Sequence, residues 1–274
     1  QNGNDAGIIG AASLVGTAIG IEENRTEILF LEPVCTENIW GGNRLKREFH
    51  YPSAGEQTGE CWGISAHPNG DGKIKNGTYA GMHLSEVWKA HPQLFGSDGT
   101  GEFPLLAKII DAREDLSIQV HPDDSYAKEH ENGANGKTEC WYILDCEKPA
   151  SLIIGHHAKT KEQLAQMIEE DKWSELLREV PVEKGDFIPI EPGTVHAIKG
   201  GCLIFETQQN SDVTYRLYDY GRLSNGKPRE LHLGKSMDVI QVPAKETDQC
   251  IVSAGALPKN QMHQLLDCAY FTIF

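Results

Sequence analysis

Short apolar runs, each ended by glycine, proline or an acidic residue, fill the sequence from residue 103 to residue 208. They have the length of β-strands and lie at 105–110, 116–120, 141–146, 151–154, 186–190, 194–198 and 202–208. Short strands with turn residues between them and few helices are typical of a sandwich or jelly roll. We therefore expect a mainly β fold, in which 141–146 and 151–154 pair across a turn at 147–149.

Other segments have different patterns. Residues 160–179 carry apolar side chains at helical spacing, and Thr160 with Gln163 can form a capping box, which predicts a helical insertion in the β fold. Residues 84–95 also have helical spacing, with Ser85 as the candidate cap. Residues 28–31 read as a strand that stops at a proline, and residues 39–42 read as a tight turn after an aromatic residue.

Net charge and cysteine usage limit the function. The formal net charge is −15, which disfavours nucleic acids and anionic membranes as partners. A small anionic substrate remains compatible, because a local basic pocket can bind it. The seven cysteines are an odd number and contain no C-x-x-C pair, which favours a reducing, cytoplasmic compartment over a disulfide framework. No stretch reaches the length that a membrane-spanning helix needs.

The two ends of the chain differ from its centre. We expect 1–26 to be an extension or the remnant of an upstream domain, 27–240 to be the catalytic domain, and 241–274 to begin a truncated C-terminal β segment. Residues 3–12 resemble the C-terminal helix of ROK-family sugar kinases, which implies fusion to a kinase domain; a leader segment is the alternative. Residues 269–274 read as a strand that either continues beyond this chain or pairs elsewhere in the fold.

Four residues have the chemistry and placement of metal ligands. Gln119 and His121 are two residues apart, so on a strand both side chains leave the same face. Glu139 precedes an apolar run, and His196 follows a Pro-Gly corner that directs it inward. Amide, imidazole and carboxylate ligands suit a borderline divalent cation. Alone, His196 would be a core histidine and Glu139 a solvated carboxylate; the Gln-x-His pattern favours the metal site.

Five motifs together resemble the type I mannose-6-phosphate isomerase family in its shorter, Firmicute-type form, and the resemblance covers residues 27 to 274. The motifs are Ile39-Trp40-Gly41-Gly42, Gln119-Val120-His121-Pro122, Lys137-Thr138-Glu139-Cys140-Trp141-Tyr142, Pro192-Gly193-Thr194-Val195-His196-Ala197 and Tyr215-Arg216-Leu217-Tyr218-Asp219-Tyr220-Gly221-Arg222. The resemblance implies a cupin scaffold (double-stranded β-helix), a bound Zn²⁺, and interconversion of mannose 6-phosphate and fructose 6-phosphate through a cis-enediol.

The resemblance also implies roles for single residues. His121, Glu139 and His196 match the family's metal ligands, and Gln119 matches a fourth. Arg216 matches an active-site arginine; its high pKa makes it a poor base, so its role would be charge stabilisation or ring opening. Lys137 matches a lysine beside the metal, where it would act as a base or bind substrate oxygens. The structural alternatives are a surface ion pair of Arg216 with Asp219 and an exposed loop position for Lys137.

The substrate-binding candidates are chosen from residue type and nearness to the motifs. Ser125, Lys128 and Arg222 lie near the motif residues and can pair with a phosphate dianion, although each suits a plain surface position equally. Trp40 can line the sugar pocket or pack in the core. The His156-His157 pair reads as surface. Two rival functions remain, a non-catalytic metal-binding cupin that senses or binds a sugar and an iron-dependent cupin oxygenase.

Overall fold

The computed structural model describes residues 28–98, 100–246, 251–253, 255 and 257–274. The expected N-terminal extension, 1–26, with its resemblance to a kinase helix, lies outside the described residues. None of the described helices is long and apolar enough to cross a membrane.

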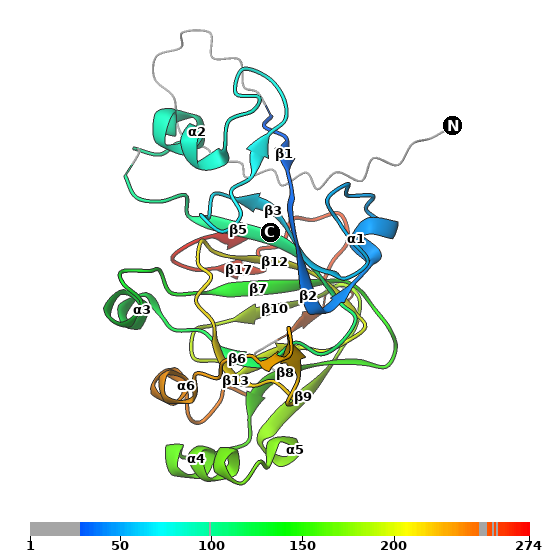
Figure 1. The fold of residues 1–274 in the computed structure, drawn as a ribbon, viewed down its shortest axis with the longest axis vertical. Helices are drawn as coiled ribbons and strands as arrows, with labels where there is room; N and C mark the ends of the chain where they lie inside the picture. Colours follow the sequence, from blue (N-terminus) through cyan, green and yellow to red (C-terminus); the bar gives the residue numbers. More distant parts are fainter. Residues whose placement is uncertain (1–27, 99, 247–250, 254, 256) are drawn as a thin grey trace.

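Two β-sheets make up the body of the protein (Figure 1). The seven-stranded sheet has the order β16-β10-β7-β12-β5-β2-β3, with bounds Val252–Ser253, Asp186–Ile190, Glu139–Cys146, Cys202–Gln209, Leu105–Ala112, Val34–Gly42 and Thr58–Ser65. The five-stranded sheet has the order β13-β6-β11-β8-β9, with bounds Tyr215–Tyr218, Ile118–Val120, His196–Ile198, Ala150–His156 and Leu177–Val182.

Apolar side chains of both sheets form one buried core between them. Ile143 and Ile188 come from the seven-stranded sheet, and Leu152 and Ile198 come from the five-stranded sheet. Burial of an aliphatic side chain of this size contributes about 1.5–3 kcal/mol, so the facing sheets hold each other in place. The predicted mainly β, two-layer fold is confirmed.

The chain changes sheet at most of its connections. Consecutive strands from β5 to β8 alternate between the seven-stranded and the five-stranded sheet. The strands from β9 to β13 alternate in the same way. The expected pairing of 141–146 with 151–154 is therefore wrong: β7 pairs with β10 and β12, whereas β8 pairs with β9 and β11. Apolar patterns locate strands but do not identify their partners.

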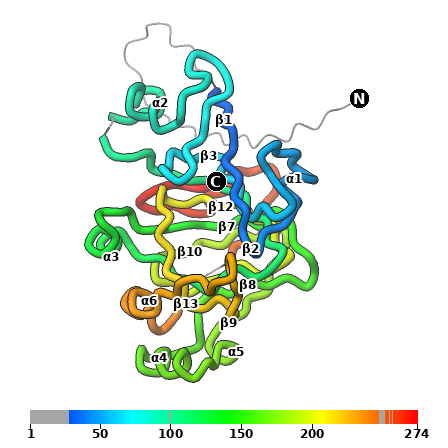
Figure 2. Tube along the Cα trace, in the orientation of Figure 1, coloured from blue at the N-terminus to red at the C-terminus, as the bar shows by residue number. Residues whose placement is uncertain are grey.

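The helices cover the outside of the sheets (Figures 1 and 2). They are α1 (Arg44–Arg47), α2 (Leu84–Ala90), the 3₁₀ turn η1 (Pro92–Phe95), α3 (Asp124–His130), α4 (Lys161–Glu169), α5 (Trp173–Leu176) and α6 (Leu233–Val239). Helices α4 and α5 form the predicted helical insertion, between β8 and β9. The Thr160 side chain caps α4 by accepting from the backbone N–H of Gln163, but the Gln163 side chain accepts from the backbone N–H of Lys159 and not of Thr160, so only half of the predicted capping box forms.

The predicted end of the first helix and the predicted cap of the second need correction. The helix expected over 160–179 ends at Glu169, because Asp171 has a positive φ of 52° and because residues from Leu177 onward pair with β8 as strand β9. Helix α2 is capped by His83 with Glu86, whereas Ser85 donates to the Asp71 carboxylate.

The expected turn at 39–42 is the end of β2, not a turn. Its glycines serve close packing, because a Cβ at Gly41 would lie 2.5 Å from the backbone nitrogen of Gly59 and one at Gly42 would meet the Asp111 carboxylate. The strand expected at 28–31 is only β1, Leu31–Glu32, which pairs with β4, Lys73–Ile74.

The C-terminal residues form small antiparallel pieces. Strand β18 (Thr272–Ile273) pairs with β17 (Leu266–Asp267), so the strand predicted at the C-terminus pairs within the described chain. Strand β16 extends the seven-stranded sheet beside β10. Phe271 packs against Cys140 and Phe187. The division of the chain at residue 240 stays a prediction. A further hairpin joins β14 (Leu223–Ser224) and β15 (Lys227–Pro228).

Candidate metal centre and active-site cavity

Strand register aligns three of the predicted site residues across the five-stranded sheet. Gln119 of β6 is directly opposite His196 of β11 on one side and Arg216 of β13 on the other. Directly opposed residues share a face of the sheet, so all three side chains point the same way. His121 follows β6 two residues after Gln119. The expected placement of Gln119 and His121 therefore assembles a row of polar side chains.

A buried triad lies beside this row. His121, Glu139 and His196 offer ligand atoms that all lie within 4.8 Å of one another. Glu139 is the first residue of β7, so it comes from the seven-stranded sheet and faces the two histidines. Its Oε2 lies 3.5 Å from His121 Nε2, and its Oε1 lies 3.4 Å from His196 Nε2. The structure thus brings the three predicted ligands together.

The hydrogen bonds of the triad fit a divalent cation. The Nδ1–H of His121 donates to the Val213 carbonyl at 2.9 Å, and the Nδ1–H of His196 donates to the Thr194 carbonyl at 2.8 Å. Each bond fixes the tautomer that leaves Nε2 unprotonated and aimed at the centre. The amide nitrogen of Gln119 lies 3.3 Å from His196 Nε2. Since the two amide atoms are nearly interchangeable in position, the Gln119 oxygen can reach the same space.

The environment of the Glu139 carboxylate also indicates a cation-binding site. Both of its oxygens are fully buried without a well-formed hydrogen bond, although Lys137 Nζ lies 2.7 Å from Oε2. Burial raises the pKa of Glu139, but the charge of Lys137 and the neighbouring histidines outweigh it and hold the pKa well below its usual range. A buried, ionised carboxylate with unsatisfied oxygens is the environment in which a metal ligand is found.

The lowered pKa of His121 predicts how the stability of the protein depends on pH. Burial, and then the Lys137 charge, lower the pKa of His121 from 6.5 to about 4. The unfolded chain therefore binds a proton that the folded site rejects, so the contribution of His121 is complete above 6.5 and is lost as the pH falls toward 4. This gap corresponds to about 3 kcal/mol. We expect the free energy of unfolding of metal-free protein, measured by urea titration, to fall accordingly across that window.

A matched variant isolates the effect. In His121→Asn no side chain titrates at this position, so the fall in unfolding free energy should be smaller by about the same 3 kcal/mol. Identical pH dependence of the two proteins would contradict the assignment of a depressed pKa to His121.

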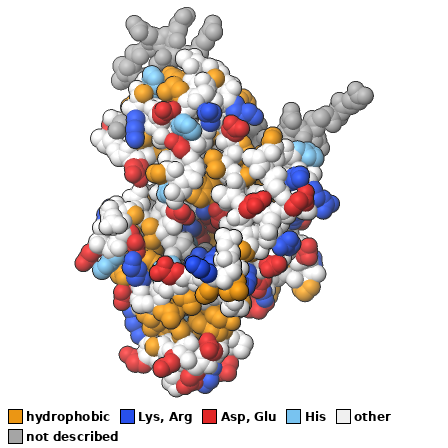
Figure 3. All heavy atoms as spheres, in the orientation of Figure 1, with side chains coloured by type: hydrophobic (Ala, Val, Ile, Leu, Met, Phe, Trp, Pro, Cys, Tyr) orange, Lys and Arg blue, Asp and Glu red, His pale blue; other side chains and the backbone are white. Residues whose placement is uncertain are grey.

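A cavity of about 450 Å³ opens next to the triad, within the size range of small-molecule sites. Figure 3 shows a hollow near the middle of one face, with acidic and basic side chains gathered around it. Four predicted residues line the cavity: Trp40, Gln119, Lys137 and Arg216. Trp40 also belongs to the core between the sheets, so it packs in the core and lines the cavity at once, and contact with a sugar stays a prediction.

The other substrate candidates lie elsewhere. Ser125 and Lys128 are exposed on α3 and do not line the cavity. Arg222 donates to the Asp219 carboxylate at 2.6 Å and does not line the cavity either. The phosphate-binding role expected for these three residues is therefore not supported by their positions.

Arg216 does not form the surface ion pair with Asp219 that was the structural alternative. The Asp219 carboxylate accepts from Arg222 and Arg229, each at 2.6 Å. Arg216 instead donates from Nε to Ser117 Oγ at 3.3 Å and from Nη1 to the Glu230 carbonyl at 2.9 Å. Burial, and then the charge of Arg229, lower its pKa. A fixed, partly desolvated guanidinium at the cavity wall is suited to stabilising negative charge.

Sequence reasoning missed the cavity residues of the seven-stranded sheet. Lys108 of β5 is directly opposite Glu206 of β12, and their charged atoms lie 3.4 Å apart. Glu60 of β3 lies 3.9 Å from the same ammonium. Burial lowers the pKa of Lys108, but Glu60 and Glu206 outweigh it and raise the pKa. The available signal was a lysine inside the apolar run of β5 and a glutamate directly after the apolar run 202–205 of β12, where unpaired charges are rare.

One oxygen of Glu206 is hydrogen-bonded, and the other lies near the ammonium groups of Lys108 and Lys137. Its Oε2 accepts from the Trp141 indole at 2.9 Å, whereas its Oε1 has no hydrogen-bond partner among the described residues. Lys137 Nζ lies 3.8 Å from this Oε1. The carboxylate therefore faces the cavity in a fixed orientation.

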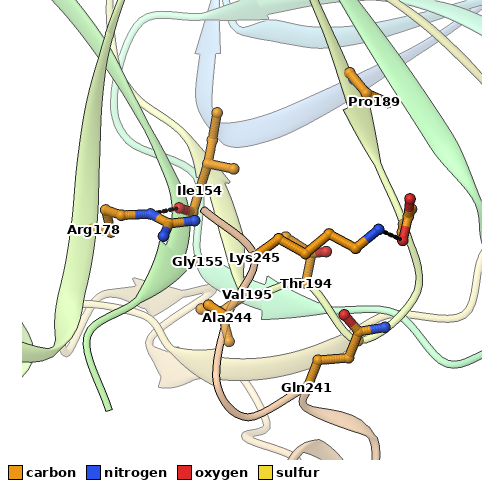
Figure 4. Close-up of a pocket in the computed structure, with 11 residues that line it drawn as sticks. Ile154, Gly155, Arg178, Pro189, Thr194, Val195, Gln241, Ala244 and Lys245 are labelled. Carbon is orange, nitrogen blue, oxygen red and sulfur yellow. Dashed lines mark hydrogen bonds and ion pairs between the residues drawn. The ribbon is translucent and has the colours of Figure 1, made fainter. Parts of the chain in front are cut away.

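A smaller cavity of about 70 Å³ lies beside the corner at residues 193–195 that precedes β11, and none of the predicted ligands lines it (Figure 4). Arg178 donates to the Ile154 carbonyl there at 2.8 Å, and Lys245 pairs with Glu191. His156, which was expected at the surface, is buried nearby, with Nε2 3.0 Å from the Gln241 carbonyl. These cations and this histidine have structural partners, so the larger cavity holds the candidate site.

Comparison with known proteins agrees with the site. The model of the phosphomannose isomerase type I catalytic domain matches residues 28–155. The chain is 53% identical over 254 residues to mannose-6-phosphate isomerase ManA of Bacillus subtilis, covering 90% of this chain and 78% of that protein. It is 47% identical over 251 residues to mannose-6-phosphate isomerase of Streptococcus mutans, with the same two coverages, 90% and 78%.

Solved structures agree as well. The crystal structure of mannose 6-phosphate isomerase from Bacillus subtilis matches with a TM-score of 0.78 and 51% identity, over 80% of this chain and 70% of that chain. A putative mannosephosphate isomerase from Archaeoglobus fulgidus matches with a TM-score of 0.66 at 20% identity, over 83% of this chain and 72% of that chain, which shows the shared fold. The predicted cupin scaffold is confirmed. The chain belongs to the type I mannose-6-phosphate isomerase family.

Proposed function

We propose that this chain is a metal-dependent aldose–ketose isomerase that interconverts mannose 6-phosphate and fructose 6-phosphate. The observation that carries the proposal is the buried triad His121, Glu139 and His196 beside a cavity that is lined by charged groups, among them Lys137, which contacts Glu139. Family membership supplies the substrate class, since the relatives that share about half of their residues with this chain carry this name.

The donor set favours Zn²⁺ as the metal. Two imidazoles and a carboxylate are typical of catalytic zinc sites, and Gln119 adds an amide oxygen. When bound, Zn²⁺ would supply Lewis-acid stabilisation of negative charge on the sugar oxygens.

The chain's own residues account for the proton movement. Isomerisation transfers a proton between C2 and C1 of the open-chain sugar through a cis-enediol. Glu206 lines the cavity and suits the role of base, because the Trp141 bond fixes its orientation and its Oε1 has no hydrogen-bond partner among the described residues. The Lys137 ammonium is 2.7 Å from Glu139 and 3.8 Å from Glu206, so we assign it to charge balance and to binding of substrate oxygens.

Arg216 suits stabilisation of the developing charge. Two of its donors are held by Ser117 and by the Glu230 carbonyl, which aims the guanidinium and leaves Nη2 for the substrate. A preorganised donor of this kind typically contributes about 2.7–4 kcal/mol to transition-state stabilisation. A cytoplasmic location is part of the same proposal, because both the cysteine usage and a sugar-phosphate substrate favour it.

A metal-reload assay tests the function. Protein stripped with a chelator should lose conversion of mannose 6-phosphate to fructose 6-phosphate, measured in a coupled assay, and addition of one equivalent of Zn²⁺ should restore it. Loss of one such electrostatic stabiliser predicts a fall in rate of about 10²–10³-fold or more. Reloading with Mg²⁺, which prefers all-oxygen sites, is the control and should restore little. Full activity of the stripped protein, or stoichiometric Zn²⁺ without turnover, would overturn the proposal.

A further inference from the structure

Cysteine side chains face each other across two antiparallel strand pairs outside the active site. Cys35 of β2 is directly opposite Cys61 of β3, and Cys202 of β12 is directly opposite Cys146 of β7. Opposed residues in antiparallel strands have Cα atoms about 4.5–5.5 Å apart, which lies inside the range that a disulfide requires. Both pairs therefore satisfy the backbone condition for a disulfide.

The two pairs differ in the chemistry of their thiols. The hydrogen bond from the Cys61 thiol, helped by one from Ser53, outweighs burial and lowers the pKa of Cys35 to about 7. The same contact, together with burial, raises the pKa of Cys61. In the other pair, burial raises the pKa of Cys202 to about 12 and also raises that of Cys146. Since the thiolate is the nucleophile, the first pair alone contains an activated sulfur.

The surroundings of the first pair separate an attacking sulfur from a shielded one. Cys35 is only half-buried, so a small molecule in solvent can reach it, whereas Cys61 is fully buried. Both pack with Leu45 and Tyr51 on the face of the sheet that lies away from the cavity. A low-pKa, accessible cysteine beside a resolving cysteine is the arrangement of redox-responsive thiol pairs.

We propose that Cys35 and Cys61 form a site of reversible oxidation by low-molecular-weight disulfides. The Cys35 thiolate attacks one sulfur of the small disulfide, forms a mixed disulfide and releases the other half as a thiolate. Cys61 then attacks the Cys35 sulfur, and its proton passes to the second small thiolate as that group leaves. Two protein thiols are oxidised by two electrons, and the small disulfide is reduced to two thiols.

The crosslink would join two strands that form one wall of the cavity. On the opposite face of β2 and β3, the neighbouring residues Thr36 and Glu60 line that cavity. Oxidation would restrict the unfolded chain, so we expect the unfolding temperature to rise by several degrees and to return after reduction. This chemistry does not depend on the isomerase activity.

Oxidised glutathione is the probe for the test. Metal-loaded protein incubated with an excess of it should lose two free thiols, and peptide mass spectrometry should find Cys35 joined to Cys61. Cys35 should react about tenfold or more faster than the other described thiols near neutral pH, because its thiolate fraction is larger. Cys35→Ala should abolish the crosslink, and Cys61→Ser, whose hydroxyl can still donate to Cys35 but cannot form a disulfide, should trap one glutathione on Cys35.

The second pair is the matched control. Cys146→Ala should react like the wild-type protein, because Cys146 and Cys202 have the backbone geometry without the activated thiol. A Cys146–Cys202 crosslink that forms at the same rate would overturn the proposal. So would a Cys61→Ser protein in which Cys35 carries no glutathione, and this readout stands even if Cys35→Ala does not fold.

Discussion

Replacing His121 with alanine is expected to remove the bound metal and isomerase turnover together. His121 supplies one of three clustered ligand atoms, and its Nδ1 bond to Val213 holds the ring in place. Loss of an outer-shell partner alone costs metal affinity about 10–100-fold, so loss of a ligand should cost more than about 100-fold. Turnover should fall by at least about 10²–10³-fold. Metal analysis after gel filtration and the coupled assay measure the two effects.

Arg216→Ala is the matched variant for this experiment. Arg216 lies in the same row across the sheet as Gln119 but contributes no atom to the triad. We expect this variant to retain its metal and to lose turnover. Metal content near the wild-type value in His121→Ala would refute the ligand assignment, and loss of metal in Arg216→Ala would show that the variants disturb the fold and not single functions.

Replacing Glu206 with glutamine should lower kcat by about 10²–10⁴-fold, the usual contribution of a general base. Glutamine has nearly the same shape and can keep the bond from the Trp141 indole, but it cannot accept a proton from carbon. Metal content should stay unchanged, because Glu206 is not part of the triad. Exchange of solvent deuterium into the sugar, followed by NMR, measures proton transfer apart from substrate binding.

Glu60→Gln is the control for this second experiment. Glu60 lines the same cavity, lies 3.9 Å from the same lysine, Lys108, and also accepts from an indole, that of Trp62 at 2.8 Å, but it comes from β3 and is more exposed than Glu206. Glu60→Gln should lower kcat much less than Glu206→Gln does. If Glu206→Gln keeps kcat within a few-fold of the wild-type value while Lys137→Met loses deuterium exchange, the base is Lys137 and not Glu206.

Most of the strands, and the clustering of the candidate ligands, could be predicted from the sequence for identifiable physical reasons. Apolar runs ended by glycine and proline located β5 to β8 and β10 to β12 to within a few residues, but not β9. Gln119 and His121 could be placed on one face because side chains alternate along a strand. The Pro-Gly corner before His196 gave its inward direction. The motif resemblance then connected residues that lie far apart in the chain, which no local pattern could do.

The remaining features depend on contacts between distant segments. The helix predicted over 160–179 fails after Glu169 because pairing with β8 decides the state of residues 177–182. Lys108 and Glu206 appear in the sequence as isolated breaks in apolar strands, and only their register shows that they neutralise each other. Arg222 matched a family motif, but its partner Asp219 holds it away from the cavity.

The origin of the triad in two different sheets has a consequence for folding. His121 and His196 follow or begin strands of one layer, whereas Glu139 begins a strand of the other. A cation held by all three clamps the layers together, and it can bind only after both have docked. Its binding free energy is therefore added to the cohesion of the whole sandwich and not to that of either sheet alone. In a cell, metal supply would then set the lifetime of this protein as well as its activity.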